Sequence, residues 1–342
     1  MSKILVAMSG GVDSSVTAYL LKKEGHEIEG VYFKLHKNEA YHEKNIKNVQ
    51  KVASYLNIPY RVISFEEVFQ EKIYDYFVKT YKKGLTPNPC VVCNKTIKLG
   101  LLVRYAKKEG FDEIATGHYA KIKDGFIYEA KDKTKDQSYF LAFVKRENLP
   151  FIRFPLSDLL KEEVKEIAKN IKVLKEIVKE KESTEICFVE NSYIEILKRH
   201  FNINLPGKVL NKEGKVVGEH KGYMHYTIGK RRGFTVKGAH KPHYVLKIDA
   251  AKNQIIVGSK EDLNTLSFEI EDINFYTKEK NFDSFVKIRY RSPKIACKVE
   301  IKENKKALIK LKESVQGVAP GQAAVFYDGE KVIGGGWIKE QK

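Results

Sequence analysis

Apolar residues in the first third of the chain fall into short runs separated by segments with helical spacing. Residues 3–8 form a compact apolar run, which is typical of a strand buried on both faces, and residues 28–35, 60–64 and 113–116 are predicted as three further strands. The intervening segments carry apolar residues at helical spacing, which predicts helices at 16–23, 49–56, 65–81 and 95–108. This alternation of strand and helix predicts a doubly wound parallel sheet of the α/β class.

The predicted secondary structure changes twice in the rest of the chain. Residues 126–144 are predicted as a β excursion, and residues 157–200 as mostly helical. From Leu205 onward, short alternating strands and frequent turns predict an all-β region that divides near residue 268. The predicted domains are 1–203, an α/β domain, 204–267, a small β-rich linking domain, and 268–342, a C-terminal β-barrel.

The 342 residues include 62 Lys and Arg against 44 Asp and Glu, a formal net charge of +18. Such an excess attracts polyanions, and nucleic acid is the usual polyanion of the cytosol. A lysine-rich surface that serves solubility is the alternative, and the mixed charges of 161–181 are typical of a solvated helix face. No apolar run is long enough to span a membrane, and the N-terminus lacks a signal-peptide pattern. We therefore expect a cytoplasmic protein without membrane contact.

A glycine-rich loop at residues 9–15, Ser-Gly-Gly-Val-Asp-Ser-Ser, separates the first predicted strand from the first helix. Its glycines allow the backbone to approach an anion closely, and its serine hydroxyls and helix-start N–H groups are donors suited to phosphate. The loop lacks the Gly-Lys-Ser/Thr ending of a Walker A motif, so it is not built to act on a γ-phosphate. Asp13 is the candidate ligand for Mg²⁺ carried by a triphosphate. A glycine-rich turn with a serine N-cap is the alternative interpretation.

The seven residues, placed directly after a first strand, resemble the loop of the pyrophosphatase-loop ATPases, which are adenine nucleotide alpha hydrolase-like proteins. This resemblance implies that ATP is cleaved between its α- and β-phosphates. AMP is then transferred to an oxygen and displaced by a nitrogen or sulfur nucleophile. The loop alone does not specify the nucleophile.

Four cysteines stand at positions 90, 93, 187 and 297. They do not form a disulfide framework in a cytosolic chain of this length, so the Cys90-Val91-Val92-Cys93 pair predicts redox chemistry or a metal site. Two prolines predict a loop over 86–89, and a basic helix is predicted to begin just after Cys93, which favours a thiolate there. For Cys187, between two apolar neighbours, a small buried hydrophobe is the alternative.

Further segments spread over nearly the whole chain point to one family. They are Thr86–Lys95, Thr116–Ala120, Lys135–Leu141, Ser183–Phe188, Gly218–Gly222, Tyr226–Gly229, Arg289–Arg291 and Ala319–Gln322. Together with the loop, they resemble the tRNA-specific 2-thiouridylase family (MnmA/TrmU type). Several spaced motifs in the right order are far more specific than any one of them.

The resemblance implies conversion of the wobble uridine, in the anticodon loop of certain tRNAs, to 2-thiouridine. ATP adenylates the C2 oxygen of the base, and a sulfur nucleophile displaces AMP. Cys187 matches the cysteine that receives sulfur as a persulfide, and Cys93 matches the one that completes its release. The implied partners are tRNA and a sulfur donor protein or sulfide source.

The same resemblance carries over the family's binding residues, position by position. The implied ATP-binding residues are Ala7, Met8, Ser9, Gly10, Gly11, Val12, Asp13, Ser14, Ser15, Phe33 and Gly117. The implied tRNA-binding residues are Asn88, Pro89, Cys90, His118, Lys135, Asp136, Gln137, Arg289, Tyr290 and Gln322. A solvated strand face is the alternative for Arg289, and a satisfied core histidine is the alternative for His118.

This sequence has Cys90 where many members of the family have Asp. Three thiolates, from Cys90, Cys93 and Cys187, would hold a [4Fe–4S] cluster and leave one iron free to bind hydrosulfide as the nucleophile. The plainer alternative retains Cys93 and Cys187 as a persulfide and disulfide couple, with Cys90 a bystander. Zinc is less favoured, because a structural zinc site requires a fourth Cys or His ligand.

Two functions of other kinds stay open at this point. A loop-sharing ligase, such as an amide synthetase or a tRNA lysidine synthetase, needs no cysteine nucleophile, so full activity of a Cys187→Ser variant would favour it. A non-catalytic tRNA-binding protein, in which the loop only caps a helix, is favoured if Asp13→Ala leaves function intact.

Overall fold

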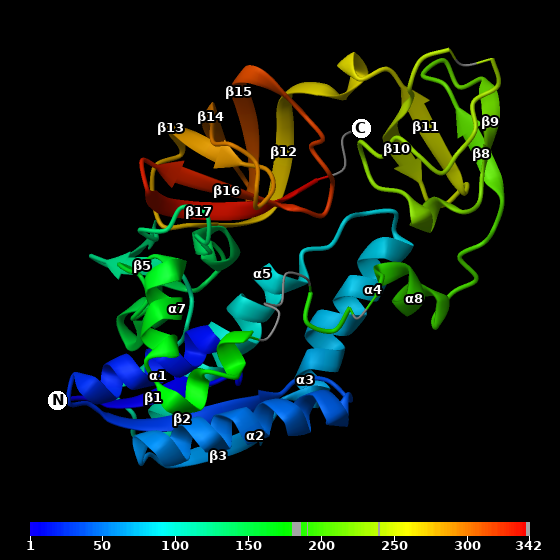
Figure 1. The fold of residues 1–342 in the computed structure, drawn as a ribbon. Helices are drawn as coiled ribbons and strands as arrows, with labels where there is room; N and C mark the ends of the chain where they lie inside the picture. The colour runs from blue at the N-terminus through cyan, green and yellow to red at the C-terminus, as the bar shows by residue number, and fades with distance from the viewer. Residues whose placement is uncertain (180–185, 190, 239, 340–342) are drawn as a thin grey trace. The chain divides into compact units, whose positions relative to one another are not determined.

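The computed structural model describes residues 1–179, 186–189, 191–238 and 240–339. The chain divides into two compact units, which Figure 1 traces from the N-terminus in blue to the last strand in red. The first unit comprises Met1–Ile73, Cys90–Thr184 and Asp328–Ile333, and the second comprises Tyr74–Pro89, Glu185–Tyr327 and Gly334–Lys342. The predicted domain boundaries near 203 and 267 stay predictions.

A five-stranded sheet in the order β3-β2-β1-β4-β7 forms the centre of the first unit, and each neighbouring pair is parallel. Its strands are β1 Lys3–Ala7, β2 Glu27–Lys34, β3 Tyr60–Ser64, β4 Glu113–Ala115 and β7 Ile152–Arg153. Successive residues of β1, from Ile4 to Val6, are all fully buried, because the strand is covered on both faces. The predicted parallel α/β sheet is confirmed. The strand order reverses at β1, and ligands of such sheets bind at this point.

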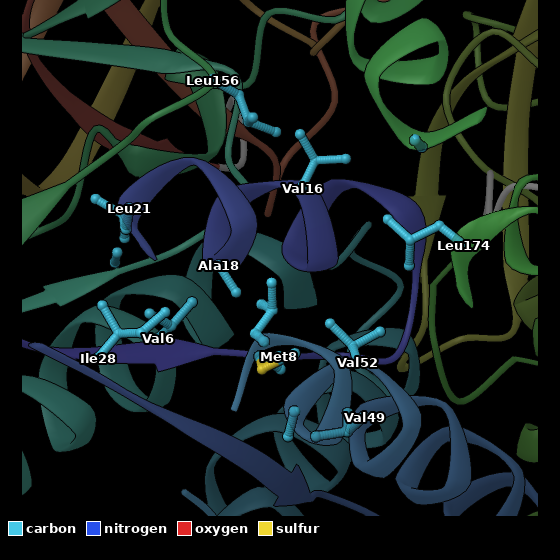
Figure 2. Close-up of a cluster of buried hydrophobic side chains, with 14 of the residues drawn as sticks. Val6, Met8, Val16, Ala18, Leu21, Ile28, Val49, Val52, Leu156 and Leu174 are labelled. Atoms are coloured by element: carbon cyan, nitrogen blue, oxygen red, sulfur yellow. The ribbon is translucent and has the colours of Figure 1, made fainter. Parts of the chain in front are cut away.

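Three helices pack their apolar faces into the core of this unit: α1 Val12–Lys23, α2 Glu39–Leu56 and α7 Lys161–Lys169. Figure 2 shows α1 lying along β1, with Ala18 on the side of the helix that faces Met8, the residue after β1, and Val16 on the other side, toward Leu156. Val49 and Val52 of α2 complete the same buried cluster. Burial of this apolar surface fixes α1 against β1, and therefore fixes the loop between them.

A continuous helical run begins at Pro89. It comprises α5 Pro89–Cys93, a π-helical segment Asn94–Leu101 and α6 Leu102–Lys108. Proline is favoured in the first helical turn, because its missing N–H has no partner there in any case. The prediction that the helix begins after Cys93 is wrong, since Cys93 lies inside the run. A second run comprises α3 Glu66–Phe69, a π-helical segment Gln70–Tyr74 and α4 Asp75–Lys82.

The β excursion predicted at 126–144 is confirmed only in its first residues. Strands β5 Ala120–Lys123 and β6 Phe126–Glu129 form an antiparallel hairpin, and β6 also pairs with Lys331 and Val332. Residues Ser138–Leu141 form a 3₁₀ turn instead of a strand. The remaining short turns of this unit are Arg146–Phe151, Lys172–Leu174 and Ile177–Lys179. None of the helices in the described ranges is long and apolar enough to cross a membrane.

In the second unit, a four-stranded sheet has the order β10-β11-β8-β9. Its strands are β8 Gly207–Leu210, β9 Val216–His220, β10 Tyr244–Asp249 and β11 Gln254–Gly258, with 3₁₀ turns at Tyr223–His225 and Glu261–Leu263. Helix α8, Tyr193–Lys198, packs Ile196 and Leu197 against Phe77 and Tyr81 of α4. The predicted all-β region after Leu205 is confirmed.

The last six strands close into a barrel. They are β12 Asn264–Phe275, β13 Asn281–Lys287, β14 Ile295–Lys302, β15 Lys306–Gln316, β16 Ala323–Asp328 and β17 Lys331–Ile338. Closure is achieved where β17 pairs antiparallel with β12, for example Asn274 with Gly335. A side chain at Gly334 would collide with the Asn274 carbonyl oxygen, so glycine is required at this seam. The predicted C-terminal β-barrel is confirmed.

Candidate active site

The glycine-rich loop follows the carboxyl end of β1 and leads into α1. Gly11 is the N-cap of α1, and no side chain caps this helix end. The first-turn N–H groups of a helix lack partners within the helix and carry partial positive charge, so they favour an anion. Gly10 has a φ of 82°, in the left-handed region that favours glycine. A side chain at Gly11 would meet only Ser9 Oγ, at 3.6 Å. The loop therefore has the donors and the space for a phosphate chain such as that of ATP.

Two of the three loop serines brace the loop itself. The Ser14 hydroxyl accepts a hydrogen bond from the Ser9 N–H at 3.1 Å and donates to the Gly11 carbonyl at 3.1 Å. The Ser15 hydroxyl also donates to the Gly11 carbonyl, at 2.8 Å, and Ser15 is fully buried. Both hydroxyls thus donate within the loop, and contact of the serine hydroxyls with phosphate stays a prediction. Ser9 is the exposed serine of the three.

The other predicted ATP-binding residues lie at the carboxyl ends of the strands around the loop. Ala7 ends β1, and the Met8 N–H that follows donates to the Val31 carbonyl of β2 at 2.8 Å. Phe33 lies near the end of β2 and packs on the ring of Phe65, with ring centroids 5.3 Å apart. The structure therefore brings these residues to the same edge of the sheet as the loop.

Gly117 lies directly against the first turn of α1. A Cβ placed on it would lie 2.9 Å from the Asp13 carbonyl carbon and 3.0 Å from the Ser14 nitrogen. Both are backbone atoms, which cannot move aside as the end of a flexible side chain can. Glycine is therefore required for the close approach of the segment after β4 to the loop.

We expect Gly117→Val to weaken ATP binding by about tenfold, because overpacking costs about 1–3 kcal/mol and here displaces the backbone of the loop. Isothermal titration with ATP measures the change. Gly117→Ala introduces a smaller side chain and is expected to have a smaller effect. Unchanged ATP affinity in the valine variant would show that this contact does not shape the site.

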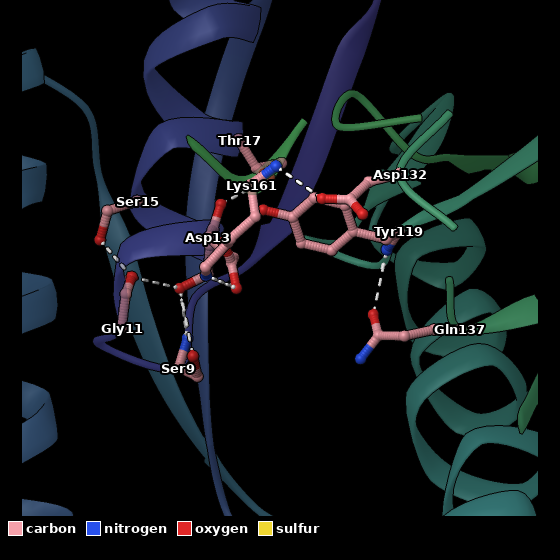
Figure 3. Close-up of polar contacts among 10 residues, drawn as sticks. Ser9, Gly11, Asp13, Ser15, Thr17, Tyr119, Asp132, Gln137 and Lys161 are labelled. Atoms are coloured by element: carbon pink, nitrogen blue, oxygen red, sulfur yellow. Dashed lines mark hydrogen bonds and ion pairs between the residues drawn. The ribbon is translucent and has the colours of Figure 1, made fainter. Parts of the chain in front are cut away.

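An ion pair with the buried side chain of Lys161 holds Asp13 beside the loop. Lys161 Nζ lies 2.7 and 2.8 Å from the two carboxylate oxygens of Asp13, and the Tyr119 hydroxyl donates to Asp13 Oδ1 at 2.9 Å (Figure 3). The Lys161 side chain is only 8% exposed, against 34% for Asp13. The interpretation of the segment starting at Lys161 as a solvated face is therefore wrong at its first residue. Sequence reasoning missed Lys161, because no spacing rule connects it with a residue so distant in the chain.

Asp132 fixes the backbone at the start of α7. Its carboxylate accepts the Lys161 N–H at 2.9 Å, and the Thr134 N–H and hydroxyl at 3.0 and 2.7 Å. Burial acts to raise the pKa of Asp132, but these hydrogen bonds outweigh it and hold the pKa below its usual value. The carboxylate thus stays charged and anchors the helix end that carries Lys161.

Three predicted tRNA-binding residues of the first unit are engaged within it. His118 is 8% exposed, its Nδ1 lies 2.7 Å from the Thr116 hydroxyl, and burial with the nearby charge of Lys98 lowers its pKa to about 3. Asp136 is buried and accepts hydrogen bonds from Ala130 and Ser138, and burial raises its pKa despite these bonds. The Tyr119 N–H donates to Gln137 Oε1 at 3.0 Å, and the Gln137 N–H donates to the Tyr119 carbonyl at 2.7 Å. These contacts match the alternative of a satisfied core histidine for His118. Lys135, in the same segment, is half-buried.

Predicted tRNA-binding residues also meet within the second unit. Asn88 Nδ2 donates to Gln322 Oε1 at 3.3 Å, and Gln322 Nε2 donates to the Pro87 carbonyl at 3.1 Å. Arg289 is exposed, and its Nη2 donates to the Gly317 carbonyl at 2.6 Å. Tyr290 follows it in the same turn. The structure thus pairs Asn88 with Gln322, although 234 positions separate them.

The cysteines differ in their surroundings. Cys90 is half-buried and Cys93 is buried, and both belong to α5, three positions apart on one side of the helical run. Cys187 belongs to the second unit and is exposed, which excludes the buried-hydrophobe alternative for it. Residues 183–185 of its predicted motif lie outside the described residues. Cys297 is buried in β14, and burial raises the pKa of its thiol to about 12.

A metal site is the remaining prediction for these cysteines. Across the ranges that the structure describes, no group of three or more His, Cys, Asp or Glu side chains is arranged to hold a metal ion. The three-thiolate [4Fe–4S] site therefore stays a prediction, and no step is derived through it.

Three domain models match the chain in succession. The tRNA methyl transferase HUP domain matches residues 2–191, the tRNA methyl transferase PRC-barrel domain matches 194–259, and the aminomethyltransferase beta-barrel domain matches 265–338. A HUP-type parallel sheet with a glycine-rich loop after its first strand, followed by these two β domains, defines the class of protein.

Relatives of nearly identical length specify the family within that class. The tRNA-specific 2-thiouridylase MnmA of Campylobacter curvus is 55% identical over 338 residues, which are 98% of this chain and 100% of the relative. Those of Nitratiruptor and Sulfurimonas denitrificans are 55% and 54% identical, over 98% and 99% of this chain and 99% of each relative. The chain belongs to the tRNA-specific 2-thiouridylase family of sulfurtransferase enzymes.

A solved structure of lower similarity is described as a 4-thiouridine synthetase–RNA complex with bound ATP. It is 18% identical, has a TM-score of 0.40, and covers 58% of this chain and 50% of its own. This similarity is too low to inform the chemistry of the site.

Proposed function

We propose that this protein converts the wobble uridine of tRNA to 2-thiouridine at the expense of ATP. The observation that carries the proposal is the match to tRNA-specific 2-thiouridylases over 98% of the chain. The uncapped helix start beside Gly10 and Gly11 and the exposed thiol of Cys187 supply the two functions that the chemistry needs. We place the activity in the cytoplasm, where tRNA and ATP meet.

The first step activates the base. The C2 oxygen of uracil forms a bond to the α-phosphorus of ATP, and the bond from that phosphorus to the α–β bridging oxygen breaks. The electron pair leaves with pyrophosphate, and the N3 proton of the uracil passes to solvent. The N–H groups at the start of α1 bind the phosphates, and Asp13 is the proposed ligand of the accompanying Mg²⁺. The half-buried edge around Phe33 and Gly117 is the proposed adenosine site.

The second step transfers sulfur. The terminal sulfur of a Cys187 persulfide attacks C2, and AMP leaves with the former C2 oxygen. The Cys93 thiolate then attacks the Cys187 sulfur, so a Cys93–Cys187 disulfide forms and the thiocarbonyl sulfur stays on the base. A dithiol reductant must afterwards restore both thiols. We propose that the β-rich domains 204–267 and 268–342 bind tRNA. Binding of this polyanion accounts for the net charge of +18.

An iron–sulfur route through Cys90, Cys93 and Cys187 is the alternative for the sulfur carrier. Two of its thiols, Cys90 and Cys93, already lie on one side of a single helix, which favours it. Iron and labile sulfide are measured in protein purified without oxygen. If active protein contains neither iron nor labile sulfide, the cluster is excluded and the persulfide route remains. Activity proportional to iron content supports the cluster.

Mass spectrometry of nucleosides tests the proposed function. Unmodified tRNA is incubated with the protein, ATP, Mg²⁺ and a sulfide or persulfide source, both with and without oxygen. We expect 2-thiouridine at the wobble position, and we expect AMP and pyrophosphate in equal amounts. Absence of 2-thiouridine under both conditions would overturn the assignment.

A further inference from the structure

Lys161 places a buried positive charge beside the proposed triphosphate loop. Its Nζ contacts both oxygens of Asp13, which lies in the first turn of α1 next to the N–H groups that are proposed to bind phosphate. Asp13 is the more exposed member of the pair, at 34% against 8%. Figure 3 shows the lysine side chain reaching Asp13 and the ring of Tyr119 alongside them. The ammonium group is therefore paired with a residue of the first turn of α1, directly after the loop glycines.

The position of this ammonium group is fixed from two sides. The Lys161 N–H is bound by Asp132 at 2.9 Å, which sets where α7 begins. The side chain is held at its other end by Asp13, which Tyr119 also contacts. A cation in a fixed position loses little freedom when it binds a ligand, so this arrangement is typical of a preorganised binding group.

A purely structural role accounts poorly for the buried charge. Helices α1 and α7 already meet in the apolar core, where Val16 and Leu21 share a cluster with Val164 and Ala168. Burying an ammonium group removes it from water, and its attraction to Asp13, which is itself 34% exposed, is weakened by solvent screening. Apolar residues would join the helices at lower cost, so the charge serves a different purpose.

We propose that Lys161 binds the pyrophosphate portion of ATP, and that Asp13 holds the ammonium group ready until Mg²⁺ arrives with the nucleotide and takes the carboxylate. This inference rests on the proposed use of ATP at the loop. An ammonium group is a compact charge with three donors, and it forms charge-assisted hydrogen bonds to phosphate oxygens. The positive charge stabilises the negative charge that develops on pyrophosphate as it leaves.

The test compares two variants that alter opposite members of the pair, Lys161→Met and Asp13→Asn. Isothermal titration uses metal-free pyrophosphate and, separately, AMP. We expect Lys161→Met to weaken pyrophosphate binding by about tenfold or more, the value of one charge-assisted hydrogen bond. Asp13→Asn removes a negative charge and frees the ammonium group, so it is expected to strengthen pyrophosphate binding. AMP affinity is expected to stay within about twofold of wild type in Lys161→Met.

A structural role for the pair predicts a different pattern. In that case both variants disturb the loop, and both weaken pyrophosphate and AMP alike. Either that pattern or unchanged pyrophosphate affinity in Lys161→Met would overturn the inference. Wild-type protein that binds neither ATP nor pyrophosphate would instead overturn the proposed use of ATP.

Matched variants of the same helix complete the experiment. Lys169→Met removes the same charge from the exposed last turn of α7, and it is expected to bind pyrophosphate as wild type does. Lys161→Arg retains the charge and is expected to recover part of the affinity. If Lys161→Met does not fold, Lys161→Gln gives the same comparison, because its amide can still donate to Asp13.

Discussion

Cys187→Ala is expected to reduce 2-thiouridine formation by at least about a thousandfold, because no other group in the proposed reaction can carry the transferred sulfur. Cys187 is exposed and lies far in the sequence from the ATP loop, so the variant is expected to bind ATP with unchanged affinity. Nucleoside mass spectrometry measures the first quantity and isothermal titration the second. The same variant abolishes either sulfur carrier, so the result is independent of whether a cluster forms.

Cys297→Ala is the matched control for this prediction. Cys297 is fully buried in the barrel, and burial raises the pKa of its thiol to about 12, so it is almost entirely protonated near neutral pH. We expect this variant to retain thiolation, with a modest loss of thermal stability from the lost sulfur contacts. Full thiolation by Cys187→Ala would contradict the proposed transfer of sulfur through Cys187.

The free energy of unfolding is expected to fall with acidification below pH 6.5 because of His118. Its pKa in the folded protein is about 3, and its ordinary value is 6.5. Above pH 6.5 the ring is neutral in both states, and it contributes no pH dependence. Between pH 6.5 and 3 the unfolded chain binds a proton that the folded protein excludes, which costs about 1.4 kcal/mol per pH unit. Stability is therefore complete above pH 6.5 and is lost progressively as the pH falls through this window.

The comparison of wild type with His118→Gln isolates this contribution. Urea unfolding is measured between pH 7 and 4.5, where His118 alone is expected to remove about 2–3 kcal/mol from wild type. Carboxylates contribute equally to both proteins, so the variant is expected to show the shallower decline. His240→Gln, at an exposed position, serves as the control and should follow wild type. Parallel curves for wild type and His118→Gln would show that the ring is protonated in the folded protein.

The central features of the fold could be predicted because they depend on local pattern. The run from Ile4 to Val6 is buried on both faces of the sheet, and such a run needs no partner to be recognised. The prediction failed where local signals compete. The prolines at 87 and 89 predict a loop, yet Pro89 starts a helix, since proline is compatible with both. Ser138–Leu141 has the apolar and aromatic residues of a strand, yet it forms a 3₁₀ turn.

In the candidate site, too, features that depend on local sequence could be predicted and features that depend on the fold could not. The glycine-rich loop is contiguous, and its position after β1 follows from the order of the elements. Lys161 could not be found in this way, because its role depends on a contact with Asp13 across 148 positions. Burial of His118 and Asp136 also depends on packing that no short motif encodes. Local chemistry was therefore predictable, whereas the charges that surround it required the fold.

The seam between β12 and β17 has a consequence for biosynthesis. Because β17 is the last of the six barrel strands to leave the ribosome, β12 and β16 must wait with open edges until it arrives. Open strand edges are templates for aggregation, and pairing over so long a separation is slow. A frameshift or premature stop before Lys331 would leave this sheet permanently open, and we expect such products to be cleared or to precipitate before they encounter tRNA.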